Sequence, residues 1–398
     1  MKKYKSFLKK IALFAAFSIF FSLKSTASTV GSTNPIQSDT IIGQEQEFVR
    51  NFNKSFAVGK NEVVMLANKY GRIDVKTGAA NQVSVNVRVR VNATSQEEAQ
   101  KMFDRINIAF SNGPEFVKAE TVIEAQNDAT IWRWNKAQTS DFAIDYEVVM
   151  PINNRLDLSN KYGTSTIAAL NAAVKIEHKY GDFKLDGATA AIIDVAYGGG
   201  QLGTISALNA SVSYGKLTSP NVNALKMKSK YSSFKFGKMQ MADVQSAYDD
   251  YQIDKVDNLK VEARYGDINI GTVEELAINS NYTDFKIKQI EANADFLTQN
   301  GNVHIGGIKS GFGSINIKGN YTDYSLAIDP SVSYQLDATG SYGNLQNPAS
   351  IKTSLVNESN HKREVMGTVG NPNTKSVVRV RLTHGNFRIK WKVVSEKL

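Results

Sequence analysis

The sequence predicts an all-β protein, a flattened parallel β-solenoid of about 17-residue two-strand coils, with an N-terminal β module that contains one helix. Two observations support this fold class: a tyrosine returns every 17 residues, and apolar residues recur at fixed offsets around it. A fixed interval of this size is typical of stacked repeats. The evenly spaced tyrosines are Tyr180, Tyr197, Tyr214, Tyr231, Tyr248, Tyr265 and Tyr282.

Each repeat contains two short runs of alternating apolar residues. Leu259 and Val261 precede Tyr265, and Ile268 and Ile270 follow it. Such alternation predicts half-buried strands. One more apolar residue lies eight positions after each tyrosine, where it is expected to fill the core at the far bend. A two-strand unit this short cannot bury its apolar face alone, so neighbouring units must stack, each adding roughly 4.8 Å along an axis.

The tyrosine and the residue after it mark the predicted corner of each coil. That residue is usually glycine, which fits a sharp corner that requires a positive φ angle at the glycine. Four units carry Ser232, Asp249, Thr283 or Thr322 instead, so the corners are not all identical. The predicted structural corners include Tyr162, Gly163, Tyr180, Gly181, Tyr197, Gly198, Tyr214, Gly215, Tyr265, Gly266, Tyr342 and Gly343.

Residues 1–27 predict a secretory signal peptide. Five lysines precede an apolar run over 11–23, and small residues at 25–27 offer a cleavage site. The apolar run is too short for a membrane-spanning helix, although an uncleaved anchor is the alternative interpretation. Residues 28–43 are small and polar and predict a linker. We therefore expect an exported chain that retains no transmembrane segment after cleavage.

Charge and cysteine content narrow the function classes further. The net charge falls from +9 to +3 when the six lysines of the signal segment are removed, so nucleic acid is a poor candidate partner. The sequence has no cysteine. It therefore has no disulfide framework, no thiolate metal site and no lipoprotein anchor cysteine. No cofactor is predicted.

Residues 44–155 predict the N-terminal β module. A repeat-like unit around Tyr70 and Gly71 stands alone, well before the main array. Alternating valines over 83–91 predict a strand with one buried face. The single helix is expected over about 95–107, capped by Thr94 or Ser95, with Glu97 or Glu98 completing a capping box. Its apolar stripe consists of Ala99, Met102, Phe103 and Ile106.

The order of these features resembles a known family. Its motifs in this chain are the alternating valine strand, Ser-Gln-Glu-Glu-Ala-Gln from Ser95, Tyr-x-Val-x-Met-Pro from Tyr146 to Pro151, and Leu156-x-Leu-x-Asn-Lys-Tyr-Gly. The sequence resembles the toastrack domain family of bacterial envelope proteins, often labelled putative adhesins. The resemblance covers most of the chain after the signal segment. It implies the repeat architecture and an envelope location, and it implies no agreed activity.

The repeat changes in the C-terminal half. The array is expected over 156–346, and its interval lengthens to 21 residues between Asn300, Tyr321 and Tyr342. The extra residues at 306–312 predict loops on one edge, where a solenoid is expected to bind. Residues 347–373 predict an irregular segment. Residues 374–398, with a corner at His384, predict capping strands that close the stack.

The capping strands carry a row of cations on the face opposite their apolar residues. Solvated charges of this kind oppose pairing between sheet edges. The alternative is a contact with an acidic glycan or a lipid headgroup. The residues are Arg379, Arg381, Arg388, Lys390 and Lys392.

No catalytic residues are predicted. The segment from Gly198 to Gly203 satisfies the dinucleotide-binding string, but it lies in the repeat register, where no helix is expected. The four histidines lack metal-ligand spacing, and no Gly-x-Ser-x-Gly elbow is present. Each histidine is interpreted as a surface or core residue.

Two ladders are the candidate binding features. Asp250, Asp267 and Asp284 would form a row spaced about 4.8 Å apart that could attract calcium. The alternative is that these aspartates form turns to nearby backbone, with Lys230 and Arg264 neutralising the row. A second ladder, formed by Tyr248, Tyr265 and Tyr282, could stack sugar rings. The alternative is that these rings only stabilise the stack.

The sequence favours a non-enzymatic envelope protein, a repeat scaffold or adhesin that binds an envelope glycan or another envelope protein through its solenoid face. Its expected location is the periplasm or the cell surface. A polysaccharide lyase or hydrolase on a β-helix is the alternative, but it needs acids grouped in one cleft. An outer-membrane barrel needs strands of roughly 9 to 11 residues, longer than those predicted here.

Overall fold

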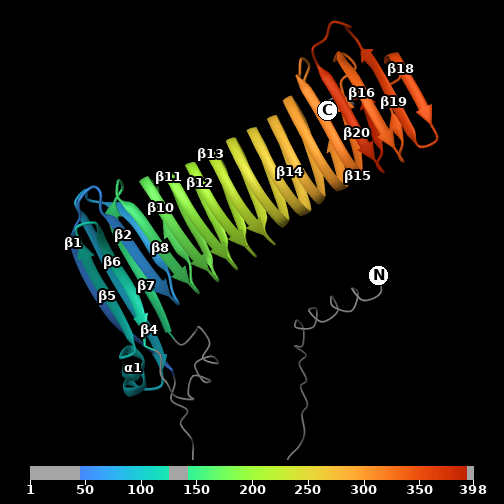
Figure 1. The fold of residues 1–398 in the computed structure, drawn as a ribbon. Coiled ribbons are helices and arrows are strands. Elements are labelled where there is room, and N and C mark those ends of the chain that lie inside the picture. The colour runs from blue at the N-terminus through green and yellow to red at the C-terminus, as the bar shows by residue number, and fades with distance from the viewer. Residues whose placement is uncertain (1–44, 125–141, 392–398) are drawn as a thin grey trace, which may run out of the picture. The chain divides into compact units, whose positions relative to one another are not determined.

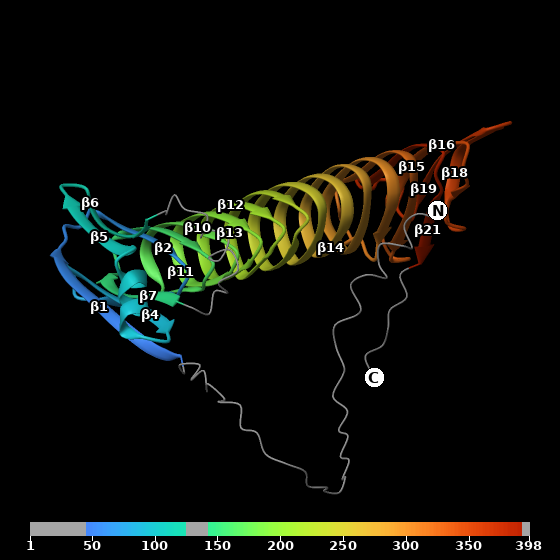
Figure 2. The same ribbon diagram turned by 90° about the horizontal axis from the view of Figure 1, so that it is seen from below.

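The computed structural model describes residues 45–124 and 142–391. The predicted signal peptide and linker lie outside these residues, as does Lys392. The described residues form an elongated body in which the strands lie side by side along its length (Figure 1). Seen from below, the middle of the body is a continuous spiral of coils (Figure 2). The predicted solenoid is therefore confirmed.

The N-terminal part contains one helix and seven strands. They are β1 (Gln46–Ala57), β2 (Val63–Lys69), β3 (Ile73–Gly78), β4 (Gln82–Ala93), α1 (Gln96–Phe103), β5 (Ile106–Gly113), β6 (Phe116–Ile123) and β7 (Phe142–Pro151). The array follows, with β8 (Arg155–Lys161), β9 (Ser165–Ile167), β10 (Leu170–Lys179), β11 (Asp182–Ala196), β12 (Gly199–Ser213), β13 (Lys216–Lys230), β14 (Ser233–Ile305) and β15 (Ser314–Ile328). The C-terminal strands are β16 (Tyr334–Ser341), β17 (Leu345–Gln346), β18 (Lys352–Ser359), β19 (Lys362–Val369), β20 (Val377–Thr383) and β21 (Phe387–Trp391).

Parallel pairing in the array follows the 17-residue repeat. Ala210 pairs with Met227, and Met227 pairs with Val244, so equivalent residues of successive coils face one another. The predicted apolar positions are buried, and the far-bend residues Val256 and Val273 are fully enclosed. Each coil contributes to two sheets. We call the sheet of segments that precede the corners the A sheet, and the sheet of segments that follow them the B sheet.

The unit around Tyr70 is the first coil of the array, and it is not isolated in space. Strand β2 pairs in parallel with β8, and β3 pairs in parallel with β9, although about 90 residues separate them in sequence. On the far side, β5 and β6 extend the A sheet, while β7, β4 and β1 extend the B sheet. Strands β6 and β7 still pair in parallel with β2 and β3. The antiparallel pairings of β5 with β6, and of β4 with β7 and β1, end the parallel stack.

The helix α1 joins β4 to β5 and is shorter than expected. Ser95 caps it by accepting a hydrogen bond from the Glu98 backbone, and the Glu98 carboxylate accepts one from the Thr94 N–H, which completes the capping box. It ends at Phe103 because Ile106 already lies in β5 with a buried side chain. Within the described residues, no helix is both long and apolar enough to cross a membrane.

The order of coils at the C-terminal end differs from the order in the sequence. Strand β20 pairs in parallel with β15 on one side and with β16 on the other, so the last coil is inserted one position before the end. The expectation that residues 374–398 close the stack is therefore wrong. A gap one coil wide separates the coil of β15 from the coil of β16 and β17. Strands β20 and β21 fill this gap and pair in parallel with the coils on both sides.

An antiparallel hairpin closes this end of the stack. Residues 347–373 were expected to be irregular, but β18 and β19 pair with each other there, and β19 pairs antiparallel with β16. The hairpin covers the open edge of β16 and halts parallel addition. Residues 306–312 form a loop as expected, but Ile308 and Phe312 within it are buried against the core.

Candidate functional site

The corner tyrosines form a continuous ladder of stacked rings. From Tyr70 and Tyr162 through to Tyr282, successive ring centroids lie 4.6–5.1 Å apart with interplanar angles of 2–11°. A second ladder at the C-terminal end runs in the spatial order Tyr321, His384, Tyr342 and His361. The sequence analysis identified His384 as a corner but missed His361, because His361 comes from the hairpin and has no repeat spacing.

The backbone at the corners corrects one expectation. At each described corner, the residue with positive φ is the tyrosine, or the Asn300 or His384 that takes its place, and its φ is 50–63°. Among the described corner glycines that follow it, φ is positive only at Gly266 and Gly301. A left-handed conformation costs a non-glycine residue roughly 1–2 kcal/mol. Ring stacking contributes about 0.5–1.5 kcal/mol per pair, which offsets that cost in a continuous ladder.

The corner glycines are required by close packing between coils. A Cβ atom on Gly198 would lie 1.9 Å from the carbonyl oxygen of Gly181, the equivalent residue in the preceding coil. Gly181 has the same relation to Gly163. Where Ser232 and Thr322 replace glycine, their buried hydroxyls donate to the carbonyl oxygens of Lys230 and Asn320.

The ladder restricts what the candidate residues Tyr248, Tyr265 and Tyr282 can bind. Both faces of Tyr248 and of Tyr265 are covered by neighbouring rings, so only their edges and hydroxyls meet solvent. A sugar cannot stack on a face that is already covered. Within the described residues, Tyr282 has a stacked ring on its Tyr265 side alone.

The aspartate row lies on the B sheet, one position beyond the corner glycines. Burial, followed by the charges of Asp284 and Asp250, raises the pKa of Asp267. Asp284 Oδ1 accepts hydrogen bonds from the backbone N–H and the side-chain amide of Asn302, at 2.7 and 3.0 Å. Asp323 accepts the same pair of bonds from Asn386. Among the described residues, no group of three or more histidine, aspartate or glutamate side chains is arranged to hold a metal ion.

A carboxylate is also buried inside the solenoid. Asp249 replaces the corner glycine and is 2% exposed. It accepts hydrogen bonds from the hydroxyls of Ser229 and Ser246 and from the backbone N–H groups of Ser232 and Ala247. Burial raises the pKa of Asp249 despite these four donors. Asp249 itself is enclosed and supports the corner, while Ser229, Ser246 and Ala247 also line a groove on the A sheet.

His178 is fully buried in a second enclosed cluster. Its Nε2 lies 3.2 Å from the hydroxyl of Ser165, and burial lowers its pKa from 6.5 to about 4. The neutral imidazole is therefore part of the core. The nearby charge of Asp182 opposes this lowering of the pKa but does not outweigh burial. The complete burial of the ring agrees with its interpretation as a core residue.

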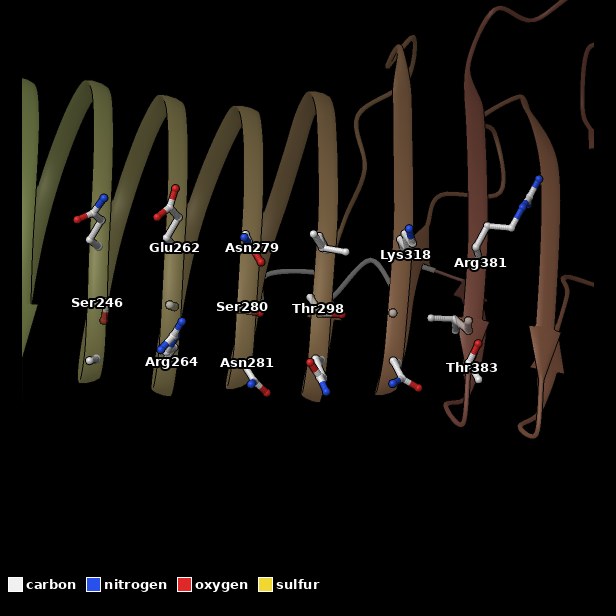
Figure 3. A pocket seen from close by; sticks show the side chains of 18 of the residues that line it. Ser246, Glu262, Arg264, Asn279, Ser280, Asn281, Thr298, Lys318, Arg381 and Thr383 are labelled. Atoms are coloured by element: carbon white, nitrogen blue, oxygen red, sulfur yellow. The ribbon is translucent and has the colours of Figure 1, made fainter.

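A large hollow on the A sheet forms a groove with a volume of about 1040 Å³. It crosses the coils from β13 to β16, and it is lined by residues one, two and three positions before the corners. Figure 3 shows Glu262, Asn279, Lys318 and Arg381 at one level, with the strand of Thr298 between those of Asn279 and Lys318. Arg264, Asn281 and Thr383 lie at the next level, nearer the corners.

The groove is mostly polar and carries both charge signs. Lys260 pairs with Glu262 at 3.2 Å, and Arg381 pairs with Asp337 at 2.7 Å. Leu297 lies in the centre of the groove and is 49% exposed. It is the most exposed large apolar side chain among these lining residues. A smaller hollow of about 390 Å³ continues the groove along the strands and adds Asp295, Asn316 and Arg379. Together they make a long surface that an extended ligand could follow.

Most of these groove residues were not predicted from the sequence, and Arg264, Arg379 and Arg381 were named there only as surface charges. In the sequence, these residues are polar side chains at the exposed positions of each repeat. That pattern does not differ from the pattern of an ordinary solvated sheet face. Of the predicted cation row, Arg379 and Arg381 line the groove, while Arg388 and Lys390 lie on β21 in the other sheet. The segment from Gly198 to Gly203 forms a corner and the start of β12, and no helix follows it.

Comparison with known proteins agrees with this architecture. Residues 194–390 match the family model described as Toastrack DUF4097. No curated protein matches the chain. The similar solved structures include a putative adhesin from Parabacteroides distasonis, at 11% identity and a TM-score of 0.21, which covers 86% of this chain and 97% of that one. A putative cell adhesion protein from Clostridium sporogenes has 6% identity and a TM-score of 0.18, covering 86% and 100% of the two chains.

The family match includes every coil that lines the groove, from Lys228 on β13 to Thr383 on β20. It also includes the corner tyrosines from Tyr197 to Tyr342. The resemblance inferred from the repeat motifs is thus confirmed over residues 194–390, where the chain carries a Toastrack DUF4097 domain.

Proposed function

We propose that this protein is an exported, non-enzymatic scaffold of the bacterial envelope that binds an extended partner through the A-sheet groove. The partner is an envelope glycan or another envelope protein, and the location is the periplasm or the cell surface. The observation that carries the proposal is the groove itself. It presents equivalent polar positions on successive coils, spaced by the roughly 4.8 Å strand separation, and a polymer can occupy such a series of subsites.

The arrangement of acids in the groove favours binding over catalysis. Glycoside hydrolysis needs two carboxyl groups roughly 5–10 Å apart. The groove lining contains Glu262, and the adjoining hollow adds Asp295, which lies two coils away and two residues along the strand. Glu262 is paired with Lys260, and Asp295 accepts a hydrogen bond from Asn316. Each of the two acids therefore already has a partner on the sheet surface.

The export part of the proposal rests on residues 1–27, whose lysines and short apolar run have the composition of a signal peptide. A polysaccharide lyase or hydrolase remains the alternative function. It would use the same groove, so a single set of binding and turnover measurements separates the two.

The test is quantitative binding by the chain that begins at residue 28. We would measure its affinity for immobilised peptidoglycan, for a panel of bacterial polysaccharides and for solubilised envelope proteins. The double variant Arg264→Glu, Lys318→Glu reverses two exposed groove cations and should weaken binding at least tenfold. The control Lys286→Glu, Lys288→Glu makes the same charge change on the exposed side of the B sheet and should stay within twofold of the wild type.

Equal loss of binding in both double variants would show a nonspecific charge effect and would contradict a groove on one sheet. Release of reducing or unsaturated ends from any bound polysaccharide would overturn the scaffold proposal in favour of the enzyme.

A further inference from the structure

The tyrosine ladder is interrupted at one corner, Asn300. This residue has the same backbone conformation as the tyrosines, with φ of 53°. Its neighbours Gln299 and Gly301 pair with Asn320 and Thr322, which flank Tyr321. Asn300 therefore occupies a tyrosine position, in the coil between those of Tyr282 and Tyr321. Its short side chain leaves the space of one ring empty.

Two aromatic faces border this space. Tyr282 stacks on Tyr265 at 5.0 Å, and Tyr321 stacks on His384 at 4.6 Å. In the part of the chain that the structure describes, neither ring has an aromatic partner on the side of Asn300. Tyr321 is 55% exposed and Tyr282 is 51% exposed, compared with 42–51% for the tyrosines of the ladder from Tyr162 to Tyr265. The facing sides of Tyr282 and Tyr321 thus form the walls of a slot, which we call the Asn300 slot.

The width of the slot matches one inserted ring. Tyr282 and Tyr321 are two coils apart, so their ring centroids lie about 9.6 Å from each other at the usual strand separation of roughly 4.8 Å. A ring at the midpoint would lie about 4.8 Å from each wall. That spacing falls within the 4.6–5.1 Å between the stacked tyrosines of the ladder. The slot is therefore open to a single ring with two apolar faces.

The rim of the slot is polar on both sides. On the groove side lie the amides of Asn281, Gln299 and Asn320, which also line the groove. On the B-sheet side lie Asp284, Asn302 and Asp323, two positions after each of the three corners. At the floor, the Asn300 amide donates to Asn281 Oδ1 at 3.3 Å.

This combination points to a sugar. A pyranose ring has two C–H faces that stack on aromatic rings and a circumference of hydroxyls that exchange hydrogen bonds with amides and carboxylates. An aromatic side chain from a protein partner would use the two walls, but it carries at most one polar group and would exchange few hydrogen bonds with the rim. We propose that the Asn300 slot holds one pyranose residue of a glycan whose neighbouring residues lie in the A-sheet groove. This inference rests on the proposed function and names its ligand as a polysaccharide.

The slot can be closed without disturbing the fold. Asn300→Tyr places at this corner the residue that occupies most of the others, with the same backbone conformation. The new ring would stack between Tyr282 and Tyr321, so the variant should fold and should melt at the same or a higher temperature. It should also exclude the sugar. The complementary variant Tyr321→Ala removes one wall, and Tyr197→Ala is its control within the uninterrupted ladder.

The experiment measures binding of soluble gluco-, manno-, chito- and uronic acid oligosaccharides by saturation-transfer difference NMR and calorimetry. We expect wild type and Tyr197→Ala to bind one of these probes equally. Asn300→Tyr and Tyr321→Ala should bind it at least tenfold more weakly. Binding that is unchanged in Asn300→Tyr but lost in Arg264→Glu, Lys318→Glu would overturn the slot and support the groove.

The remaining outcomes are also decisive. If the wild type binds none of the oligosaccharides but binds solubilised envelope proteins, the sugar assignment is wrong and the groove proposal survives. If the groove variant binds every probe as well as the wild type does, the proposed function itself is wrong, whatever Asn300→Tyr shows.

Discussion

The middle of the solenoid and its two ends are built from the same coil but are assembled differently. Between Tyr162 and Tyr282, neighbours in sequence are neighbours in space, and every coil pairs with the next in the same register. At the ends this relation fails. The coil of Tyr70 stacks on that of Tyr162 across the whole N-terminal module, and the coil of His384 lies between those of Tyr321 and Tyr342.

The difference follows from what each region must satisfy. An interior coil pairs with an equivalent strand on each side, so its backbone groups are satisfied by repetition of the same unit. A terminal coil would expose a row of unpaired backbone groups. Both ends therefore use antiparallel strands, β7, β4 and β1 at one end and the hairpin of β18 and β19 at the other, which stop further parallel addition. The middle can therefore be built from repeated units, whereas each end needs strands of its own that stop parallel pairing.

The largest effect should come from removing the inserted C-terminal coil. A chain that stops at residue 373 lacks β20 and β21, so β15 and β16 lose their shared partner. We expect residues 314–346 to lose hydrogen-exchange protection almost completely, while the coils from Tyr180 to Tyr248 keep theirs. Protection that stays even along the whole array would contradict the insertion.

A Cβ atom at an interior corner should cost nearly as much. In Gly198→Ala the added atom would meet the carbonyl oxygen of Gly181, and overpacking of this kind costs typically about 1–3 kcal/mol. The control is Gly59→Ala, outside the array, where the nearest atom is the flexible Glu62 carboxylate at 3.1 Å. Its free energy of unfolding should change by less than about 0.5 kcal/mol. Urea denaturation of both variants measures the difference, and equal effects would refute the close approach of coils.

The buried histidine should make the middle of the array sensitive to acid. Because the pKa of His178 falls from 6.5 to about 4 on folding, the unfolded chain binds its proton at a higher pH than the folded chain does. Its contribution to stability is complete above pH 6.5 and is lost as the pH falls toward about 4, by about 3 kcal/mol. His178→Gln should remove this slope from the stability profile. The exposed His304→Gln should leave it, and a slope unchanged in both would contradict the burial.

The smallest effects concern single rungs of the ladder. Tyr197→Ala removes stacking contacts on two sides and should lower stability by about 1–2 kcal/mol. Asn300→Tyr should raise it by a similar amount, since it adds two stacked pairs where the described ladder has none. Thermal melting of the two variants compares the continuous and interrupted parts of the ladder. A lower melting temperature for Asn300→Tyr would mean that the corner at 300 differs from the others.

Much of the middle could be predicted from sequence because its information is local and repeated. The offsets of Leu259, Ile268 and their equivalents fix the strands, the buried faces and the register together. The conformation of the corner was harder. Glycine beside tyrosine suggests positive φ at the glycine, yet the glycine is required by a carbonyl oxygen one coil away, and stacking allows the tyrosine to adopt the left-handed conformation.

Neither the ends nor the binding surface could be predicted from local sequence patterns. The partner of β20 is determined by which gap is open after β16 has formed, and no spacing within residues 374–398 records that choice. The groove is equally hidden, because Asn279, Gln299 and Lys318 become one surface only after three coils stack. The Asn300 slot was visible as an irregular corner, but its meaning depends on the ring faces on either side.

The central claim is that interior coils are interchangeable units, and a pair of deletions tests it most directly. Removing residues 248–264 joins Ala247 to Tyr265 and leaves every remaining strand opposite its equivalent, so the protein should fold with its circular dichroism and solubility preserved. Removing only residues 248–255 moves the next strand out of register, exposing Leu259 or burying Lys260, and should cause misfolding or aggregation. If the 17-residue deletion proves the more damaging of the two, the coils are not the units of this fold.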